Sequence, residues 1–156
     1  MVFACACGRI DFDPLADAGS SSDGGTNDSG SNAVCGAAAI PNCPEGTITA
    51  SRFMLSSDSA MITTSHGLSS TMCGSGNGAP EVTYVITPTN AATYMLSVIA
   101  PPFTAYYVLD GCCGGAEIDC GVVSTPLMIP RTAGQTFTVV IEGTLGSSTT
   151  LMVSGI

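Results

Sequence analysis

From Cys35 onward, short segments rich in Val, Ile, Thr, Tyr and Phe alternate with turns rich in Gly, Pro, Asn and Ser. Successive side chains of a strand point to opposite faces of a sheet, so this texture predicts β-strands. The clearest predicted strands are residues 81–87, 93–99, 103–109, 136–142 and 148–154, and weaker ones are 47–54, 60–65 and 125–129. About eight short strands at this spacing predict an all-β, two-sheet sandwich.

The period of two also predicts which side chains form the core. The inward positions of three strands are Val82, Tyr84 and Ile86; Tyr94, Leu96 and Val98; and Phe137, Val139 and Ile141. Proline cannot donate to a central ladder, and Asn-Gly and Asp-Gly pairs favour tight turns. The strand boundaries therefore fall at Pro88, Pro101, Pro102, Pro126 and Pro130, with turns at Asn77–Gly78 and Asp110–Gly111.

The first 33 residues have a different character. Residues 16–33 are a polar run of Gly, Ser, Asp and Asn, and 8–33 contain too few apolar residues to offset the entropy of ordering them. We predict a disordered acidic linker at 8–33 and a β-sandwich domain at 34–156. The five Asp of the linker do not have the spacing of an EF-hand loop, which favours solubilising charge.

Residues 1–7 are too short for a signal peptide, but they resemble the end of a bacterial lipobox. Cys7 follows Ala6 with Ala4 three positions before the cysteine, and Cys5 fits the same pattern with Val2. We interpret 1–7 as the remnant of a lipoprotein signal, with Cys7 (or Cys5) as the lipidated residue. The alternative is an ordinary N-terminus with two incidental thiols.

Composition and charge exclude one class of partner. The 156 residues include three Arg, no Lys and twelve acidic residues, which gives a formal net charge of −9. Proteins bind nucleic acids largely through Lys and Arg that neutralise phosphates, so we expect no nucleic-acid partner. No stretch approaches the roughly 18 apolar residues of a membrane-spanning helix.

Eight cysteines in a chain of this size indicate either disulfides or a metal site. The chain has no Cys-x-x-Cys motif and a single histidine, so disulfides are favoured, and they persist in oxidising compartments. We predict pairing of Cys113 with Cys120 across a Gly-rich turn and of Cys35 with Cys43. That leaves Cys73 for Cys112, one of the 15 pairings that six cysteines allow.

Four segments in order resemble the bacterial pre-peptidase C-terminal domain: 78–88 (GAPEVTYVITP), 92–98 (ATYMLSV), 107–120 (YVLDGCCGGAEIDC) and 133–143 (AGQTFTVVIEG). Such domains occur in secreted proteins and lipoproteins of environmental bacteria such as myxobacteria. The resemblance implies a jelly-roll-like sandwich that is not catalytic and that usually accompanies a secreted peptidase or other exoenzyme. Some members bind collagen or calcium. This chain departs from the family's arrangement because it carries no enzyme.

Candidate binding residues cluster after the predicted strand 103–109. Tyr106 and Tyr107 are adjacent, so one of them should point outward, where it suits a protein or glycan ligand or simply covers the sheet. Asp110 follows directly. Asp110, Glu117 and Asp119 are calcium candidates, with solvated loop charge as the alternative. We expect no other cofactor.

His66 could act as a base for Ser65, Ser69 or Ser70, oriented by Asp58 or Asp110. No Gly-x-Ser-x-Gly elbow accompanies it, so a surface-loop histidine is the favoured interpretation and a small hydrolase the alternative. The sequence thus predicts a non-catalytic module of the cell envelope or the extracellular space, anchored in the membrane by lipid and binding an extracellular protein or glycan through the loop 110–121. A second alternative is the detached accessory domain of a secreted peptidase.

Overall fold

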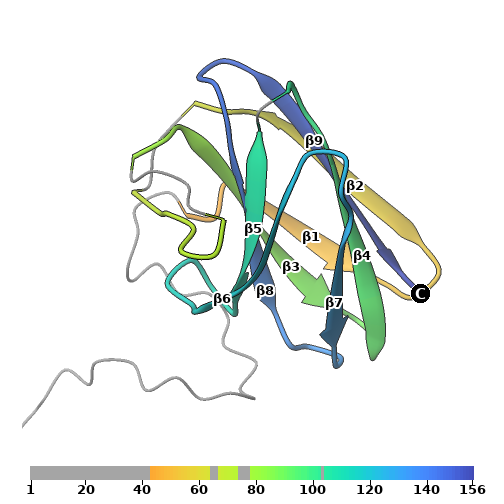
Figure 1. The fold of residues 1–156 in the computed structure, drawn as a ribbon. Coiled ribbons are helices and arrows are strands. Elements are labelled where there is room, and N and C mark those ends of the chain that lie inside the picture. Colours follow the sequence, from red (N-terminus) through yellow and green to blue (C-terminus); the bar gives the residue numbers. More distant parts are fainter. Residues whose placement is uncertain (1–42, 64–66, 74–77, 103) are drawn as a thin grey trace, which may run out of the picture.

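The computed structural model describes residues 43–63, 67–73, 78–102 and 104–156, and these form nine β-strands (Figure 1). No helix long and apolar enough to cross a membrane occurs within these ranges. The predicted linker 8–33, Cys5, Cys7, Cys35, Ser65 and His66 lie outside them. The strands are β1 (Gly46–Ala50), β2 (Leu55–Met61), β3 (Glu81–Pro88), β4 (Ala92–Ile99), β5 (Ala105–Asp110), β6 (Glu117–Val122), β7 (Leu127–Arg131), β8 (Phe137–Glu142) and β9 (Ser148–Gly155).

The strands build two sheets, one with the order β1-β3-β8-β5-β6 and one with the order β2-β9-β4-β7. Four antiparallel pairs, β2·β9, β3·β8, β4·β7 and β5·β6, nest one inside the next along the chain and alternate between the sheets. This nesting is the topology of a jelly roll. β1 is an addition, paired in parallel with β3 at the edge of the five-stranded sheet. The all-β, two-sheet prediction is confirmed.

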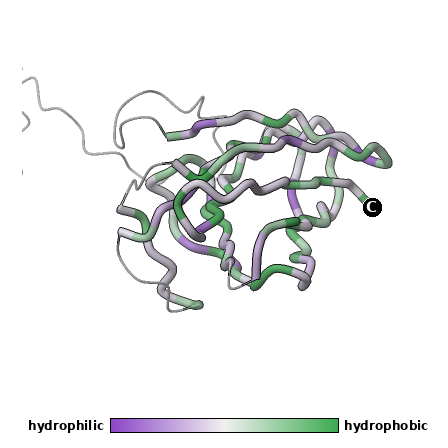
Figure 2. Tube along the Cα trace, turned by 90° about the horizontal axis from the view of Figure 1, so that it is seen from above, coloured by the Kyte–Doolittle hydropathy of each residue, from purple (hydrophilic) through white to green (hydrophobic). Residues whose placement is uncertain are grey.

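The core lies between the sheets and contains all nine predicted inward residues. Phe137, Tyr84, Tyr94, Leu96 and Ile141 are at most 1% exposed. Hydrophobic positions run through both layers and strongly hydrophilic ones are few (Figure 2), in keeping with a chain in which only 10% of residues are charged. Close packing of these large side chains is the main stabilising term of such a sandwich.

Two strands differ from the sequence prediction. β2 was predicted at 60–65 but occupies Leu55–Met61, a segment of three serines, one aspartate and only three apolar residues. β6 was not predicted at all, because its sequence, EIDCGV, has the composition of a turn. Both are edge strands, which bury fewer side chains and so need less of the β-forming pattern.

The outer faces of the two sheets differ. On the five-stranded sheet, outward-facing Glu81, Thr83, Tyr107 and Val140 are all buried. The segment 67–70 contributes to this cover, since Leu68 packs against Tyr107 and Val140 and its N–H donates to Glu81 Oε1 at 3.3 Å. The outer face of the four-stranded sheet has no comparable cover among the described residues: Leu55, Met61, Ile99 and Met128 are each 44–66% exposed.

Candidate functional site

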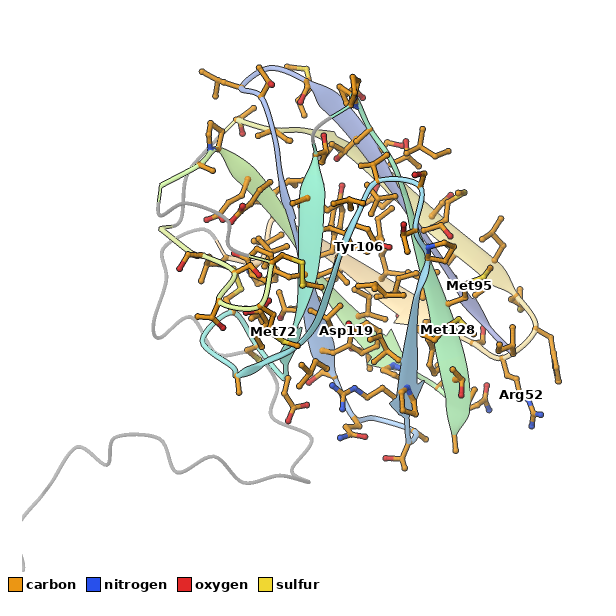
Figure 3. All side chains as sticks on the ribbon, in the orientation of Figure 1. Arg52, Met72, Met95, Tyr106, Asp119 and Met128 are labelled. Atoms are coloured by element: carbon orange, nitrogen blue, oxygen red, sulfur yellow. A yellow bond between two sulfur atoms is a disulfide. The ribbon has the colours of Figure 1, made fainter. Side chains whose placement is uncertain are left out.

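Tyr106 and Tyr107 do point to opposite faces of β5, but neither is exposed. Tyr106 is 0% exposed within the inter-sheet core, where its hydroxyl donates to the carbonyl of Thr125 (Figure 3). Tyr107 is 1% exposed under Leu68. The prediction of an outward tyrosine was therefore wrong, because the second face of this sheet is covered as well.

Burial has a measurable effect on the phenol groups. It raises the pKa of Tyr106 to about 12, and the pKa of Tyr84 to about 12 with help from the nearby charge of Asp58. Burial also raises the pKa of Tyr107, and the carboxylates of Glu142 and Glu81 raise it further. Glu81 and Glu142 are direct cross-strand partners on β3 and β8, 0% and 4% exposed. They form a covered acidic pair next to Tyr107.

The predicted recognition loop 110–121 is a short turn followed by β6. Asp110 N–H donates to the Ala116 carbonyl at 2.8 Å, and Gly115 N–H donates to the Cys112 carbonyl at 2.8 Å. The Asp110 carboxylate lies 3.0 Å from an Arg131 guanidinium nitrogen, in an ion pair that joins the turn to the end of β7. Asp110 thus has a structural partner within the fold.

Glu117 holds the segment 70–72 against the sheet. Its carboxylate accepts hydrogen bonds from Ser70 Oγ at 2.5 Å, from Thr71 N and Oγ1 at 2.7 and 2.8 Å, and from Met72 N at 3.2 Å. Burial by itself would raise the pKa of this carboxyl, but the hydrogen bonds from Ser70, Thr71 and Met72 outweigh burial, and its pKa is lowered from 4.5. The Glu117 carboxylate therefore holds in place the segment that covers Tyr107.

The third calcium candidate, Asp119, accepts a hydrogen bond from the neighbouring Cys120 N at 2.8 Å. Asp110, Glu117 and Asp119 therefore have three different protein partners. Within the described ranges, no group of three or more His, Cys, Asp or Glu side chains is arranged to hold a metal ion. Calcium binding stays a prediction.

Three disulfide assignments were wrong. Cys43 bonds to Cys113 and Cys73 bonds to Cys120, so the predicted pairs Cys113–Cys120, Cys35–Cys43 and Cys73–Cys112 cannot form. Cys112 is also disulfide-bonded. The sequence argument favoured short loops, whereas the observed bridges span 70 and 47 residues, because they join the segments beside β1 and before β3 to the β5–β6 region. These bridges indicate an extracytoplasmic protein.

The described residues of the predicted Ser–His–Asp set do not form a catalytic arrangement with one another. Ser70 is 3% exposed and committed to Glu117, Asp110 pairs with Arg131, and Asp58 lies on β2 in the other sheet. His66 and Ser65 lie outside the described residues. The hydrolase alternative gains no support from Ser70, Asp58 or Asp110.

Sequence reasoning missed the outer face of the four-stranded sheet, which we call the methionine face. Strand alternation and register define its fourteen positions. They are Leu55, Ser57, Ser59 and Met61 of β2; Ser148, Thr150, Met152 and Ser154 of β9; Thr93, Met95, Ser97 and Ile99 of β4; and Met128 and Pro130 of β7. None carries a charge, although the chain carries a net charge of −9. The signal was present in the outward positions of the predicted strands, which hold Met, Ser and Thr where a solvated face usually holds Lys, Glu or Asp.

One border of the methionine face is the edge strand β2, which we call open because no described strand pairs with its outer side. Ile62 N–H donates to the Ser147 carbonyl at 2.9 Å, which fixes the hydrogen-bonding phase of the β2·β9 ladder. It follows that Ser56, Asp58 and Ala60 bond to β9, while the N–H and C=O groups of Leu55, Ser57, Ser59 and Met61 point away from it. The connection before β2 adds Phe53 and Met54, 77% and 63% exposed, next to the C-terminus (Figure 1).

No family model matches the chain, and no curated protein matches it. Among solved structures, the chain is similar to the Yersinia pseudotuberculosis-derived mitogen, with 13% identity over 66% of this chain and 86% of the mitogen and a TM-score of 0.46. It is also similar to Aeromonas hydrophila PliG, a periplasmic inhibitor of g-type lysozyme, with 10% identity over 70% of this chain and 97% of PliG and a TM-score of 0.43. The resemblance to the pre-peptidase C-terminal domain stays a prediction.

Proposed function

We propose that this chain is a non-catalytic binding module outside the cytoplasm, and that it takes up an extended segment of another protein at the open edge of β2. The observation that carries the proposal is the combination of that edge with the uncharged methionine face. In this proposal a lipid on Cys7 or Cys5 holds the module at the cell envelope, as the lipobox resemblance suggests.

The edge supplies the main-chain contacts that an added strand needs. An extended peptide beside β2 can bond to the outward N–H and C=O groups of Leu55, Ser57, Ser59 and Met61. Its own alternate side chains would extend the methionine face. Such a face suits a protein partner, because interfaces are enriched in Met and depleted of charge at their centre.

The other edges are less suited to this use. β7 carries Pro130, which lacks an N–H, and ends at the ion-paired Arg131. β6 is joined to the segment 67–73 through the Cys73–Cys120 bridge and has a register shift opposite β5. β1 is only five residues long. β2 has seven residues, five of them exposed.

Charge favours a basic segment over a second copy of this chain. Asp58 lies at the centre of β2 and is exposed. Antiparallel self-pairing centred on Asp58 would place two aspartates directly opposite each other, which destabilises a sheet. A partner strand with Lys or Arg at that position would form a favourable cross-strand pair, and the net charge of −9 attracts basic segments in general.

A displayed library of random peptides, selected on the immobilised full chain, tests the proposal. We expect enriched peptides with alternating apolar or small residues and one basic residue. Binding should fall strongly with Ser57→Pro, which removes one outward N–H while leaving the β2·β9 ladder intact, and with Asp58→Lys. Thr47→Arg, an exposed change on β1 of the other sheet, is the matched control and should bind as wild type.

Peptides that bind wild type and Ser57→Pro equally would place the site elsewhere, and the loop 110–121 would then be tested with Asp110→Ala. A dimer in sedimentation that Ser57→Pro dissociates would identify a second copy as the occupant. A hydrolytic activity lost with His66→Ala would support the enzyme alternative, and co-purification with a secreted peptidase would support the accessory-domain alternative.

A further inference from the structure

Three methionines lie on the methionine face on three neighbouring strands. Met95 of β4 and Met128 of β7 are direct cross-strand partners, labelled next to each other in Figure 3. Met152 of β9 lies opposite Ser97, two residues from Met95, and so is its diagonal neighbour. Each flanking residue along its strand is buried in the core, which fixes the three thioethers on the outer face.

The hydrogen-bonding pattern of the β4·β7 ladder brings Met95 and Met128 especially close. Ile156 N–H donates to the Thr93 carbonyl at 2.9 Å, so the β4 residues bonded to β9 are Thr93, Met95, Ser97 and Ile99. Met95 and Met128 are then a non-hydrogen-bonded pair, the kind in which Cα atoms are only about 4.5 Å apart and side chains are closest. A diagonal neighbour at about 7–8 Å is within reach of a flexible side chain such as Met152.

The donor set is chemically selective. Thioether sulfur is a soft, uncharged ligand that prefers Cu(I) to hard cations such as calcium or magnesium. No carboxylate or imidazole lies among the fourteen positions of the face to attract a hard or borderline ion. All five cysteines in the described part of the chain are disulfide-bonded, so none of them competes as a thiolate.

We propose that Met95, Met128 and Met152 form a binding site for Cu(I), or for Ag(I), which is also a soft d10 monovalent cation, on the outer face of the four-stranded sheet. The net charge of −9 raises the local concentration of cations around the molecule. This site goes beyond the peptide-binding function and does not depend on it, because it rests on the three thioether sulfurs and not on the edge of β2.

The test uses the full chain, with free thiols blocked by N-ethylmaleimide and the methionine methyl groups labelled with ¹³C. Cu(I) is titrated anaerobically against a chromophoric Cu(I) chelator, and Ag(I) is titrated separately by NMR. We expect one ion per chain and methyl shifts confined to Met95, Met128 and Met152. Because a thioether carries no proton, the affinity should be constant between about pH 5 and pH 8, unlike that of a histidine site.

The variant Met95→Leu/Met128→Leu/Met152→Leu should lose Cu(I) binding while unfolding in urea close to wild type, because leucine and methionine have similar volumes. The matched control, Met54→Leu/Met72→Leu, changes two methionines 63% and 60% exposed elsewhere and should bind Cu(I) as wild type. Equal affinity in the triple variant, shifts centred on Met54 or Met72, or affinity that falls steeply below the pKa of histidine would each overturn the proposal.

Discussion

Ser70 and Glu117 are 47 positions apart in the sequence, yet the Ser70 hydroxyl donates to the Glu117 carboxylate at 2.5 Å. This contact, with those from Thr71 and Met72, connects the segment before β3 to β6 and keeps Leu68 over Tyr107. The Glu117 carboxylate therefore helps to hold the cover of the five-stranded sheet in place, together with the Leu68 N–H bond to Glu81 and the Cys73–Cys120 bridge.

Glu117→Gln should lower the free energy of unfolding by about 1–2 kcal/mol, because charge-assisted hydrogen bonds become neutral ones. The pKa of Glu117 is lowered in the folded state. The contribution of its carboxylate to the free energy of unfolding is therefore present above pH 4.5, and it is lost as the pH falls through the folded-state pKa. Urea unfolding should show a difference between wild type and variant at pH 7 that shrinks toward pH 3. Asp119→Asn, whose carboxylate bonds only to the adjacent Cys120 N among the hydrogen bonds described, is the control and should change stability less. A difference that grows on acidification would contradict the prediction.

Cleavage after Glu117 separates Cys113 from Cys120 and so decides the disulfide pairing. Under non-reducing conditions, mass spectrometry should find Cys113 joined to a peptide containing Cys43, and Cys120 joined to one containing Cys73. Cys73→Ser/Cys120→Ser should destabilise the fold by about 4 kcal/mol in the chain-entropy model for a loop of this length. A peptide linking Cys113 directly to Cys120 would show that the bridges differ from those described.

Two neighbouring glycines provide a matched pair of substitutions. A Cβ on Gly115 would lie 1.7 Å from the Asp110 carbonyl oxygen, whereas a Cβ on Gly114 would meet nothing within 4 Å. Gly115→Ala should therefore open the turn before β6 and lower the melting temperature by several degrees, since a cost of about 1 kcal/mol shifts it by roughly 2–8 °C. Gly114→Ala should melt close to wild type. Equal melting temperatures for the two variants would mean that the turn relaxes freely.

Tyrosine ionisation should report the burial of the phenol groups. The pKa values of Tyr84 and Tyr106 are about 12, and that of Tyr107 is raised as well. Unfolding restores tyrosine pKa values near 10. The free energy of unfolding is therefore unaffected by tyrosine ionisation below about pH 10, and it falls as the pH rises through the folded pKa values. Absorbance at 295 nm should rise together with the loss of near-ultraviolet circular dichroism above about pH 11. Full ionisation of Tyr84, Tyr106 and Tyr107 near pH 10 in a folded protein would contradict their burial.

The sequence predicts those strands whose own residues alternate between apolar and polar. In 81–86 and 137–141, alternating inward residues specify both strand and face, and the structure agrees. The pattern misplaced β2 and missed β6, since an edge strand such as Leu55–Met61 is held by its ladder to β9 and not by its own hydrophobicity. It also could not show that Tyr107 is covered, because the cover comes from Leu68, 39 positions away.

The methionine face and the disulfides illustrate the same distinction. Met95, Met128 and Met152 each occupy an outward position that alternation identifies, but their meeting depends on which strands are neighbours. Cys73 and Cys120 are likewise joined by topology, and proximity in sequence favoured other pairs.

The position of β9 has a consequence for the order of assembly. β9 is the last strand, yet it lies between β2 and β4, and neither of these pairs with the other. During synthesis or passage through a secretion channel, the four-stranded sheet can close only after Ser148–Gly155 has emerged, so no earlier part of the chain can lock it prematurely. Pairing across such sequence distances is slow, on the order of milliseconds to seconds. Both described bridges, Cys43–Cys113 and Cys73–Cys120, lie before β9 in the sequence, so they can close before the strand that completes the four-stranded sheet has emerged.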